Sequence, residues 1–263
     1  MPHKSAEYKI LEKLAIVQYA TKYNFAPFVS PDASTTEAAV QYSSRLLKRL
    51  VKGKLVRPIP LYGGQKALRY NEFFCLTKEG HNAVETGRYK YVDPKSINNV
   101  QHESGKIDIA LGFLYAFPDY HFEIDYNKIL RTPKPYNPDI YIKMTNGQKT
   151  YEFLVEFERT RSIQTILDEK LKHSDKYDFQ KNGISGAAKY LYFYTDEWWD
   201  VFVRPCEYKN YEYRLHVVED KLKDLIRLAR GLKHGFLFAP YHYFNRLNEP
   251  VFLDLLGAKR KLI

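Results

Sequence analysis

The chain has 263 residues, enough for one large domain or two small ones, and its 44% hydrophobic content is ordinary for a globular protein. No apolar run approaches the roughly 18 residues of a membrane span, and MPHKSAEYKI lacks a signal peptide's apolar stretch, so we expect a soluble, cytoplasmic protein without a membrane partner. The net charge is +10, and residues 1–96 carry +8 of it (16 Lys and Arg against 8 Asp and Glu), which indicates a polyanionic partner for the first third of the chain.

Two helices are expected first. An apolar stripe predicts a helix over roughly residues 6–23. The turn-rich SPDASTT offers Ser34, Thr35 or Thr36 as the N-cap of a second helix, TEAAVQYSSRLLKRLVKGK, which ends at Gly53.

A β-hairpin and a short helix follow. The segments KLVRPIPLY and ALRYNEFFCLT predict two strands around the turn Gly63-Gly64, and TKEGHNAVETG predicts the helix. The order helix, turn, basic helix, hairpin, helix resembles a winged helix-turn-helix, which implies duplex DNA as the partner. Two other interpretations remain: a solvated basic surface, and a winged helix that docks a protein.

The expected DNA contacts lie in and beside the stretch from residue 45 to residue 69, which holds eight basic residues and no acidic one. A polar and basic helix face can read bases in the major groove, while a basic hairpin contacts the neighbouring phosphates. The base-reading candidates are Gln41, Tyr42, Ser44, Arg45 and Lys48, and the phosphate contacts expected on the hairpin are Arg57, Lys66 and Arg69.

The second domain is expected over residues 97–263, after a winged helix at 1–88 and a linker at 89–96 within the polar ETGRYKYVDPKS. Its elements read as helix, three strands, helix, strand: a helix at 97–116, strands at 121–125, 138–144 and 149–160, a helix at 162–177 and a strand at 189–195. A long helix at about 213–232 and a last strand in FLFAPYHYF follow. The whole chain is therefore expected to be α/β, or α+β overall.

The stretch FLVEFERT alternates apolar residues with acids, so Glu156 and Glu158 share one face of a strand. Two carboxylates about 7 Å apart on one pleat repel each other unless a cation lies between them. The cation expected there is a metal ion, and a salt-bridging arginine is the alternative.

The element order and the acids resemble the restriction-endonuclease-like PD-(D/E)xK nucleases. Pro138-Asp139 opens one strand and Glu156-Phe157-Glu158 lies on the next, so Asp139 and Glu156 converge across a hairpin. The resemblance implies Mg²⁺ or Mn²⁺ held by Asp139, Glu156 and Glu158, and metal-dependent cleavage of DNA.

The chain departs from the nuclease motif at Glu158, where the motif has lysine. In SIQTILDEKLKHSDKY, Lys170 shares a helical stripe with apolar residues and points toward the sheet, so it is the candidate replacement. Two alternatives stay open: Lys170 is a snorkelling or ion-paired lysine, or Arg159 neutralises Glu158 without a metal. Glu103 and Glu123 are weaker acidic candidates, more consistent with solvated surface acids.

The combination of LTKEG, NNVQHES, PD, VEFERT and DEKLKHSDKY is similar to the replication-relaxation family of plasmid and mobile-element proteins, over nearly residues 5–195. The resemblance implies a role in plasmid replication or mobilisation at a DNA origin, as a nicking endonuclease or relaxase. It also implies other relaxosome or replication proteins as partners and allows a homodimer. A non-catalytic accessory factor or regulator with a degenerate nuclease fold is the alternative.

Overall fold

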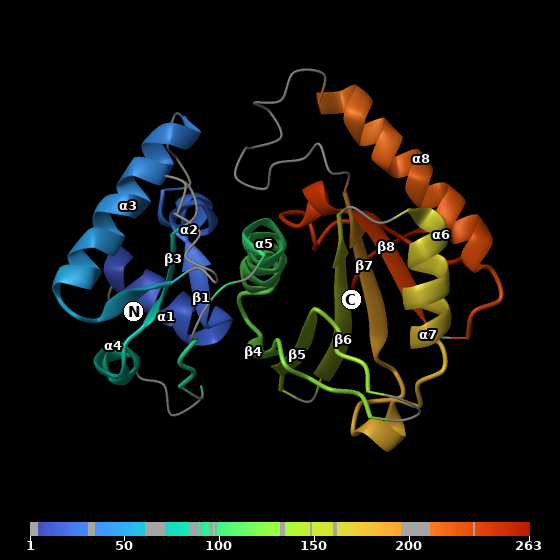
Figure 1. The fold of residues 1–263 in the computed structure, drawn as a ribbon, viewed down its shortest axis with the longest axis horizontal. Coiled ribbons are helices and arrows are strands. Elements are labelled where there is room, and N and C mark those ends of the chain that lie inside the picture. The colour runs from blue at the N-terminus through green and yellow to red at the C-terminus, as the bar shows by residue number, and fades with distance from the viewer. Residues whose placement is uncertain are drawn as a thin grey trace. The chain divides into compact units, whose positions relative to one another are not determined.

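The structure, a computed structural model, describes residues 5–30, 35–60, 72–84, 89, 91–94, 97, 99–131, 135–147, 149–159, 162–195, 211–233 and 235–263. The chain is mixed α/β, as expected, and divides into two compact units, residues 1–111 and 112–263 (Figure 1). The linker expected at residues 89–96 stays a prediction, since part of that segment lies outside the described residues. Among the described residues, no helix has the length and apolar character needed to cross a bilayer.

Unit 1 is built from helices around a small antiparallel sheet with the strand order β1-β3-β2. Its sheet is held by β3, whose four residues are all buried and pair with β1 on one side and β2 on the other. The bounds are α1 Ala6–Val17, β1 Tyr19–Thr21, α2 Lys22–Val29, α3 Thr36–Lys52, β2 Val56–Ile59, β3 Phe73–Leu76, α4 Lys78–Ala83 and α5 Val100–Ala116, which crosses the unit boundary.

The single helix expected over residues 6–23 was wrong. Helix α1 ends at Val17, and the φ of 68° at its C-cap Gln18 turns the backbone out of the helix while the Gln18 N–H still donates to the Leu14 carbonyl. Thr21 then starts a new helix, because its hydroxyl accepts from the Asn24 N–H and the Asn24 side chain accepts from the Thr21 N–H, a capping box. The apolar stripe itself stops at Val17, and the next position on that face is the polar Thr21, where the second helix is capped.

Helix α3 forms where it was expected, and Thr35 is its N-cap. Its buried face carries Ala39, Leu46, Leu47 and Leu50. The basic residues lie on the opposite, exposed face, so α3 is amphipathic with a cationic outer side.

Unit 2 contains a seven-stranded sheet in the order β10-β9-β8-β7-β6-β5-β4. Strands β6, β7 and β8 run parallel, and the β4-β5-β6 part is antiparallel. The short strands β9 and β10 were not expected from the sequence. The bounds are β4 His121–Asp125, β5 Ile140–Asn146, β6 Lys149–Glu158, α6 Ile163–Thr165, η2 Ile166–Leu171, α7 Lys172–Ser174, η3 Gln180–Asn182, β7 Lys189–Tyr194, α8 Tyr211–Ala229, β8 Phe236–Pro240, η5 Tyr241–Tyr243, β9 Phe252–Leu253 and β10 Lys259–Arg260.

The helix expected at residues 162–177 is present but changes its winding. Helix α6 passes into η2, a π-helical stretch from Ile166 to Leu171, and continues as α7. Such π-helical turns are rare and are found often at functional sites. Lys170 lies in this stretch, and the segment α6–η2–α7 covers the same sheet face as α8 (Figure 1).

Strand β6 separates two packing layers by simple alternation. Phe153 and Phe157 point to one face, where Phe153 packs on Phe113 with ring centroids 5.4 Å apart. Leu154 points to the other face and belongs to a large aromatic and aliphatic core with Tyr190 and Tyr192. Glu156 and Glu158 share the parity of Leu154, so both acids enter this second core rather than water.

Candidate functional site

The site is built on the end of β6, where two glutamates are buried. Glu156 is 0% exposed and Glu158 is 6% exposed. In the parallel ladder Glu156 lies beside Tyr192 of β7, and Glu158 lies beside Tyr194. A buried carboxylate is unfavourable unless it is hydrogen-bonded or paired with a cation, so both acids require partners.

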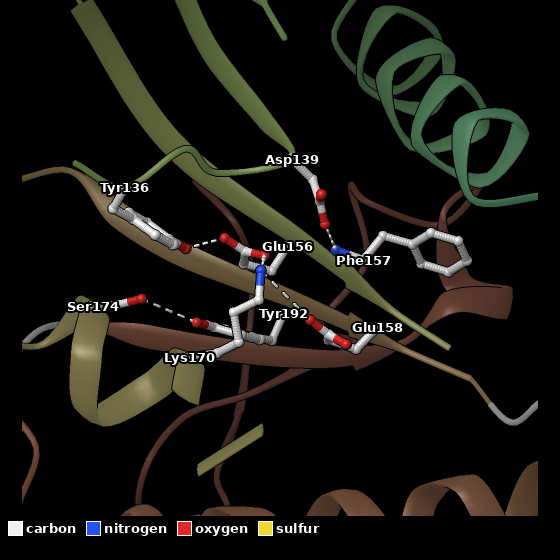
Figure 2. Close-up of polar contacts among 8 residues, drawn as sticks. All are labelled: Tyr136, Asp139, Glu156, Phe157, Glu158, Lys170, Ser174 and Tyr192. Carbon is white, nitrogen blue, oxygen red and sulfur yellow. Dashed lines mark hydrogen bonds and ion pairs between the residues drawn. The ribbon is translucent and has the colours of Figure 1, made fainter. Parts of the chain in front are cut away.

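Lys170 supplies the charge that the acids require. Its Nζ lies 2.8 Å from Glu156 Oε2 and 3.7 Å from Glu158 Oε1 (Figure 2). The lysine comes from η2, so it faces the sheet as its place in the apolar stripe predicted. The cation between the two carboxylates is therefore a lysine ammonium in this structure.

Asp139 completes the cluster from the neighbouring strand. It directly precedes β5, whose register pairs Ile140 with Val155, and Asp139 Oδ2 accepts a hydrogen bond of 2.9 Å from the Phe157 N–H. This brings Asp139 next to Glu156, as expected from the hairpin between them. The four candidate residues from three separate segments thus meet at one place (Figure 2).

The charges of this cluster act on the pKa of Lys170. Burial by itself would lower the pKa of the ammonium group, but Glu156, then Asp139, and also Glu158 outweigh burial and hold the pKa above its ordinary value. Lys170 is therefore a cation at neutral pH. The three carboxylates and one ammonium carry a formal charge of −2.

Whether these residues can bind a divalent ion depends on how many carboxylate oxygens they offer to one ion position. In the described part of the chain, no three acid, His or Cys side chains are arranged around one ion position. Mg²⁺ in proteins takes as few as one or two carboxylates, with water and phosphate oxygens as its other ligands. Asp139 and Glu156 supply two such donors, and Lys170 occupies the cation position in this conformation. The donor set therefore suits a hard divalent ion in chemical type and in charge once Lys170 moves away from Glu156.

Sequence reasoning missed the tyrosines around the acids. Tyr136 donates its hydroxyl hydrogen to Glu156 Oε1, and Tyr192 lies beneath the cluster with its hydroxyl 3.3 Å from Ser174 Oγ (Figure 2). Burial, and then the charge of Glu156, raise the pKa of Tyr192 well above its ordinary value, so this hydroxyl stays protonated. Among 23 tyrosines no sequence pattern separates these two, although Tyr136 stands three residues before Asp139.

The weaker acidic candidates do not join the cluster. Glu103 lies in unit 1, where it accepts from the Tyr19 hydroxyl and pairs with Lys106 at 2.9 Å, so it is a partly buried, paired acid rather than a solvated one. Glu123 is exposed on β4, as expected for a surface acid. Arg159 directly follows β6 and is partly buried.

The candidate DNA-contacting face is on α3. Gln41, Arg45 and Lys48 are exposed, and Tyr42 and Ser44 are partly exposed. The guanidinium carbon of Arg45 lies 5.8 Å from the centre of the Tyr42 ring. An open hollow of about 310 Å³ runs beside this face and is lined by Lys22, Val40, Gln41, Ser44, Arg45 and Lys48.

Of the residues expected to contact phosphates on the hairpin, the structure describes Arg57, which is partly buried. Arg57 on β2 is bonded to Asp93 and to the carbonyl of Pro94, so part of its hydrogen-bonding capacity is used within unit 1. Lys66 and Arg69 lie outside the described residues, and their expected phosphate contacts stay predictions.

No protein-family model, curated protein or solved structure matches this chain.

Proposed function

We propose that the protein binds duplex DNA through unit 1 and nicks one DNA strand at the acid–lysine cluster of unit 2, as a factor of plasmid or mobile-element replication or mobilisation. The observation that carries the proposal is the convergence of Asp139, Glu156, Glu158 and Lys170 at one place in the fold. The replication-relaxation resemblance supplies the biological setting of the proposal, an origin of replication or transfer.

Unit 1 supports DNA binding by its element order and its charge. Unit 1 has a helix, a short strand, two helices and two further strands, with the sheet order β1-β3-β2, and this order supports the proposed winged helix. In that fold α3 enters the major groove, and its outer face here carries Gln41, Arg45 and Lys48. Arginine and glutamine are the side chains that pair bidentately with guanine and adenine edges.

Unit 2 supports the nuclease assignment by the position of its acids. Strands β4, β5 and β6 are antiparallel, and a parallel β7 is reached through the α6–η2–α7 segment; this order supports the proposed restriction-endonuclease-like core. Asp139 and Glu156 lie side by side across β5 and β6, which supports their proposed role as metal ligands.

Each residue of the cluster has a role in this proposal. Asp139 and Glu156 would hold the divalent ion, and Glu158 would keep Lys170 near the site once the lysine leaves Glu156. Lys170, a cation at neutral pH, then stabilises the negative charge that develops on the scissile phosphate. A bound Mg²⁺ or Mn²⁺ would polarise the phosphate and activate the attacking water.

A second candidate function rests on a different observation. Both oxygens of Glu156 have partners, Tyr136 and Lys170, and the carboxylate is fully buried. A closed cluster of this kind is also what a non-catalytic accessory DNA-binding factor would keep as a structural ion pair. The two functions share unit 1 and differ only in whether the cluster opens to an ion.

DNA binding is tested by salt titration and a matched pair of double variants. If α3 and the hairpin contact about five phosphates, log affinity falls against log salt with a slope of about −4 to −5. Arg45→Ala with Lys48→Ala should weaken specific binding more than nonspecific binding. Lys223→Ala with Arg227→Ala removes the same charges from α8, where both side chains are exposed, and should change little. A salt-independent affinity would contradict the assignment.

Nicking is tested with supercoiled plasmid carrying the cognate origin, purified protein and Mg²⁺ or Mn²⁺, together with calorimetry of ion binding. Conversion to open circles that depends on the ion supports the endonuclease. Absence of both nicking and ion binding selects the accessory factor.

A further inference from the structure

Tyr136 is held rigidly against Glu156 although it belongs to no named strand. Its backbone forms an isolated two-way bridge with Leu130, with both N–H to carbonyl distances at 2.8 Å. Its ring contacts Tyr177 and His173, with centroids 5.3 Å and 5.9 Å apart. The residue is 9% exposed, so its hydroxyl has little freedom to turn away from the carboxylate.

The Tyr136 hydroxyl and Lys170 divide the two oxygens of Glu156 between them. Tyr136 donates to Oε1, and Lys170 donates to Oε2 at 2.8 Å (Figure 2). Because a carboxylate with one oxygen fixed can turn only about that contact, Oε2 is held facing the place where the ammonium lies. Lys170 is 5.9 Å from the centre of the Tyr136 ring, so the ring also forms a wall of this place.

We propose that Tyr136 is a positioning residue for Glu156: it anchors one carboxylate oxygen so that the other is presented to the divalent ion that replaces Lys170. This role rests on the proposed nuclease function. Partners that orient a metal-binding side chain in this way typically change metal affinity about 10- to 100-fold when removed.

If Tyr136 had only a structural role, its removal would destabilise the fold without a specific effect on ion binding. A second tyrosine–glutamate pair in the chain provides the control that separates the structural role from the positioning role. On the same face of β6, Tyr141 donates to Glu152 Oε1 at 2.5 Å, while the other Glu152 oxygen accepts from the Ser185 N–H at 2.5 Å. This second tyrosine–glutamate pair has no lysine at its carboxylate among the described contacts. Tyr136→Phe and Tyr141→Phe therefore remove the same hydrogen bond to a buried glutamate at two different places.

The experiment measures Mn²⁺ affinity by calorimetry, and kcat and KM for plasmid nicking, in full-length wild type and in both variants. We expect Tyr136→Phe to weaken Mn²⁺ binding about 10- to 100-fold and to lower kcat with KM for DNA unchanged, whereas Tyr141→Phe leaves all three within about twofold. A thermal melt accompanies each variant and is expected to show similar losses of stability for both.

The outcomes separate the role of Tyr136 from the function on which it rests. Wild type that binds Mn²⁺ together with a Tyr136→Phe variant of equal affinity overturns the positioning role and leaves the nuclease proposal standing. Equal losses of Mn²⁺ affinity in both variants overturn it too, because they indicate a general effect of destabilisation. Wild type that binds no Mn²⁺ removes the nuclease proposal and the role together.

Discussion

Glu152 and Glu156 are two buried glutamates on one face of one strand, each bonded to a tyrosine, and they differ in their second partner. Glu152 completes its hydrogen bonds with a backbone N–H from Ser185, whereas Glu156 completes them with the ammonium of Lys170. Glu152 is thus held by neutral donors that are part of the fold. Glu156 is held by the charge of a lysine side chain from η2.

The comparison distinguishes a carboxylate that supports the fold from one that is available for chemistry. A carboxylate that accepts a hydrogen bond from a backbone N–H can lose that partner only if the local backbone unfolds. A carboxylate that is paired with a lysine can exchange the lysine for another cation. Asp139 and Glu158 surround only the second glutamate, which concentrates negative charge at that end of β6. The following predictions test this difference, beginning with the largest effect.

The largest effect is expected from neutralising the two glutamates in turn. Glu156→Gln removes the 2.8 Å ion pair of Lys170, whose side chain is 17% exposed, and leaves the lysine its longer 3.7 Å contact with Glu158, so the loss should be about 3 kcal/mol, at the low end for a broken buried pair. Glu152→Gln keeps neutral partners and should cost about 1–2 kcal/mol. Urea unfolding of both variants without metal measures the difference, and equal losses would remove the distinction between the two sites.

The next effect is catalytic and concerns the lysine that only Glu156 has. Lys170→Ala should lower ion-dependent nicking about 10²- to 10³-fold, because it removes a group that stabilises charge in the transition state, while DNA binding stays intact. Lys170→Arg should recover little, since the planar guanidinium restores charge without the lysine's geometry. Lys172→Ala is the control, because this exposed lysine pairs with Asp168 and lies outside the cluster. Full nicking activity in Lys170→Ala would refute the role.

A pH dependence should follow from the raised pKa of Lys170. Burial opposes the charge, but Glu156 and the other acids raise the folded-state pKa above the ordinary 10.5. A raised lysine pKa stabilises the fold fully below pH 10.5, and this stabilisation is lost as the pH rises through the folded-state value. The difference in unfolding free energy between wild type and Lys170→Gln should therefore be constant from pH 7 to about 10 and shrink above it. Urea titrations at these pH values measure it, and a difference that grows with pH would contradict the ion pairing.

The smallest effect on stability is expected at Asp139. Asp139→Asn retains an oxygen that can accept from the Phe157 N–H, so the unfolding free energy without metal should change by less than about 1 kcal/mol. Mn²⁺ affinity should nevertheless fall, since an amide oxygen is a weaker ligand than a carboxylate. A loss of several kcal/mol in thermal melts without metal would make Asp139 half of a structural ion pair and would contradict the ion-binding role.

Most elements were predictable because they are local. A short stretch of sequence is enough to specify each of these elements. Examples are the amphipathic stripe and Thr35 cap of α3, the alternating side chains of β6 and the apolar run of β7. The break at Gln18 was not predicted, because the positive φ and the capping box that make it are set by a few individual residues and not by the apolar period. The π-helical winding of η2 was hidden for the same reason, since its apolar stripe fits an ordinary helix equally well.

By itself, the sequence determined that Glu156 and Glu158 share a strand face, that Asp139 lies across a hairpin from them, and that Lys170 points inward. Only the tertiary structure decided what these groups contact. The contact of Lys170 with Glu156 spans 14 residues, and that of Tyr136 spans 20. Such contacts depend on how a π-helical turn and a bridged loop are placed over the sheet, and no local period of the chain encodes that placement. The physical reason is that a side chain's neighbours along the strand follow from backbone geometry, whereas its partners across the core follow from packing of the whole unit.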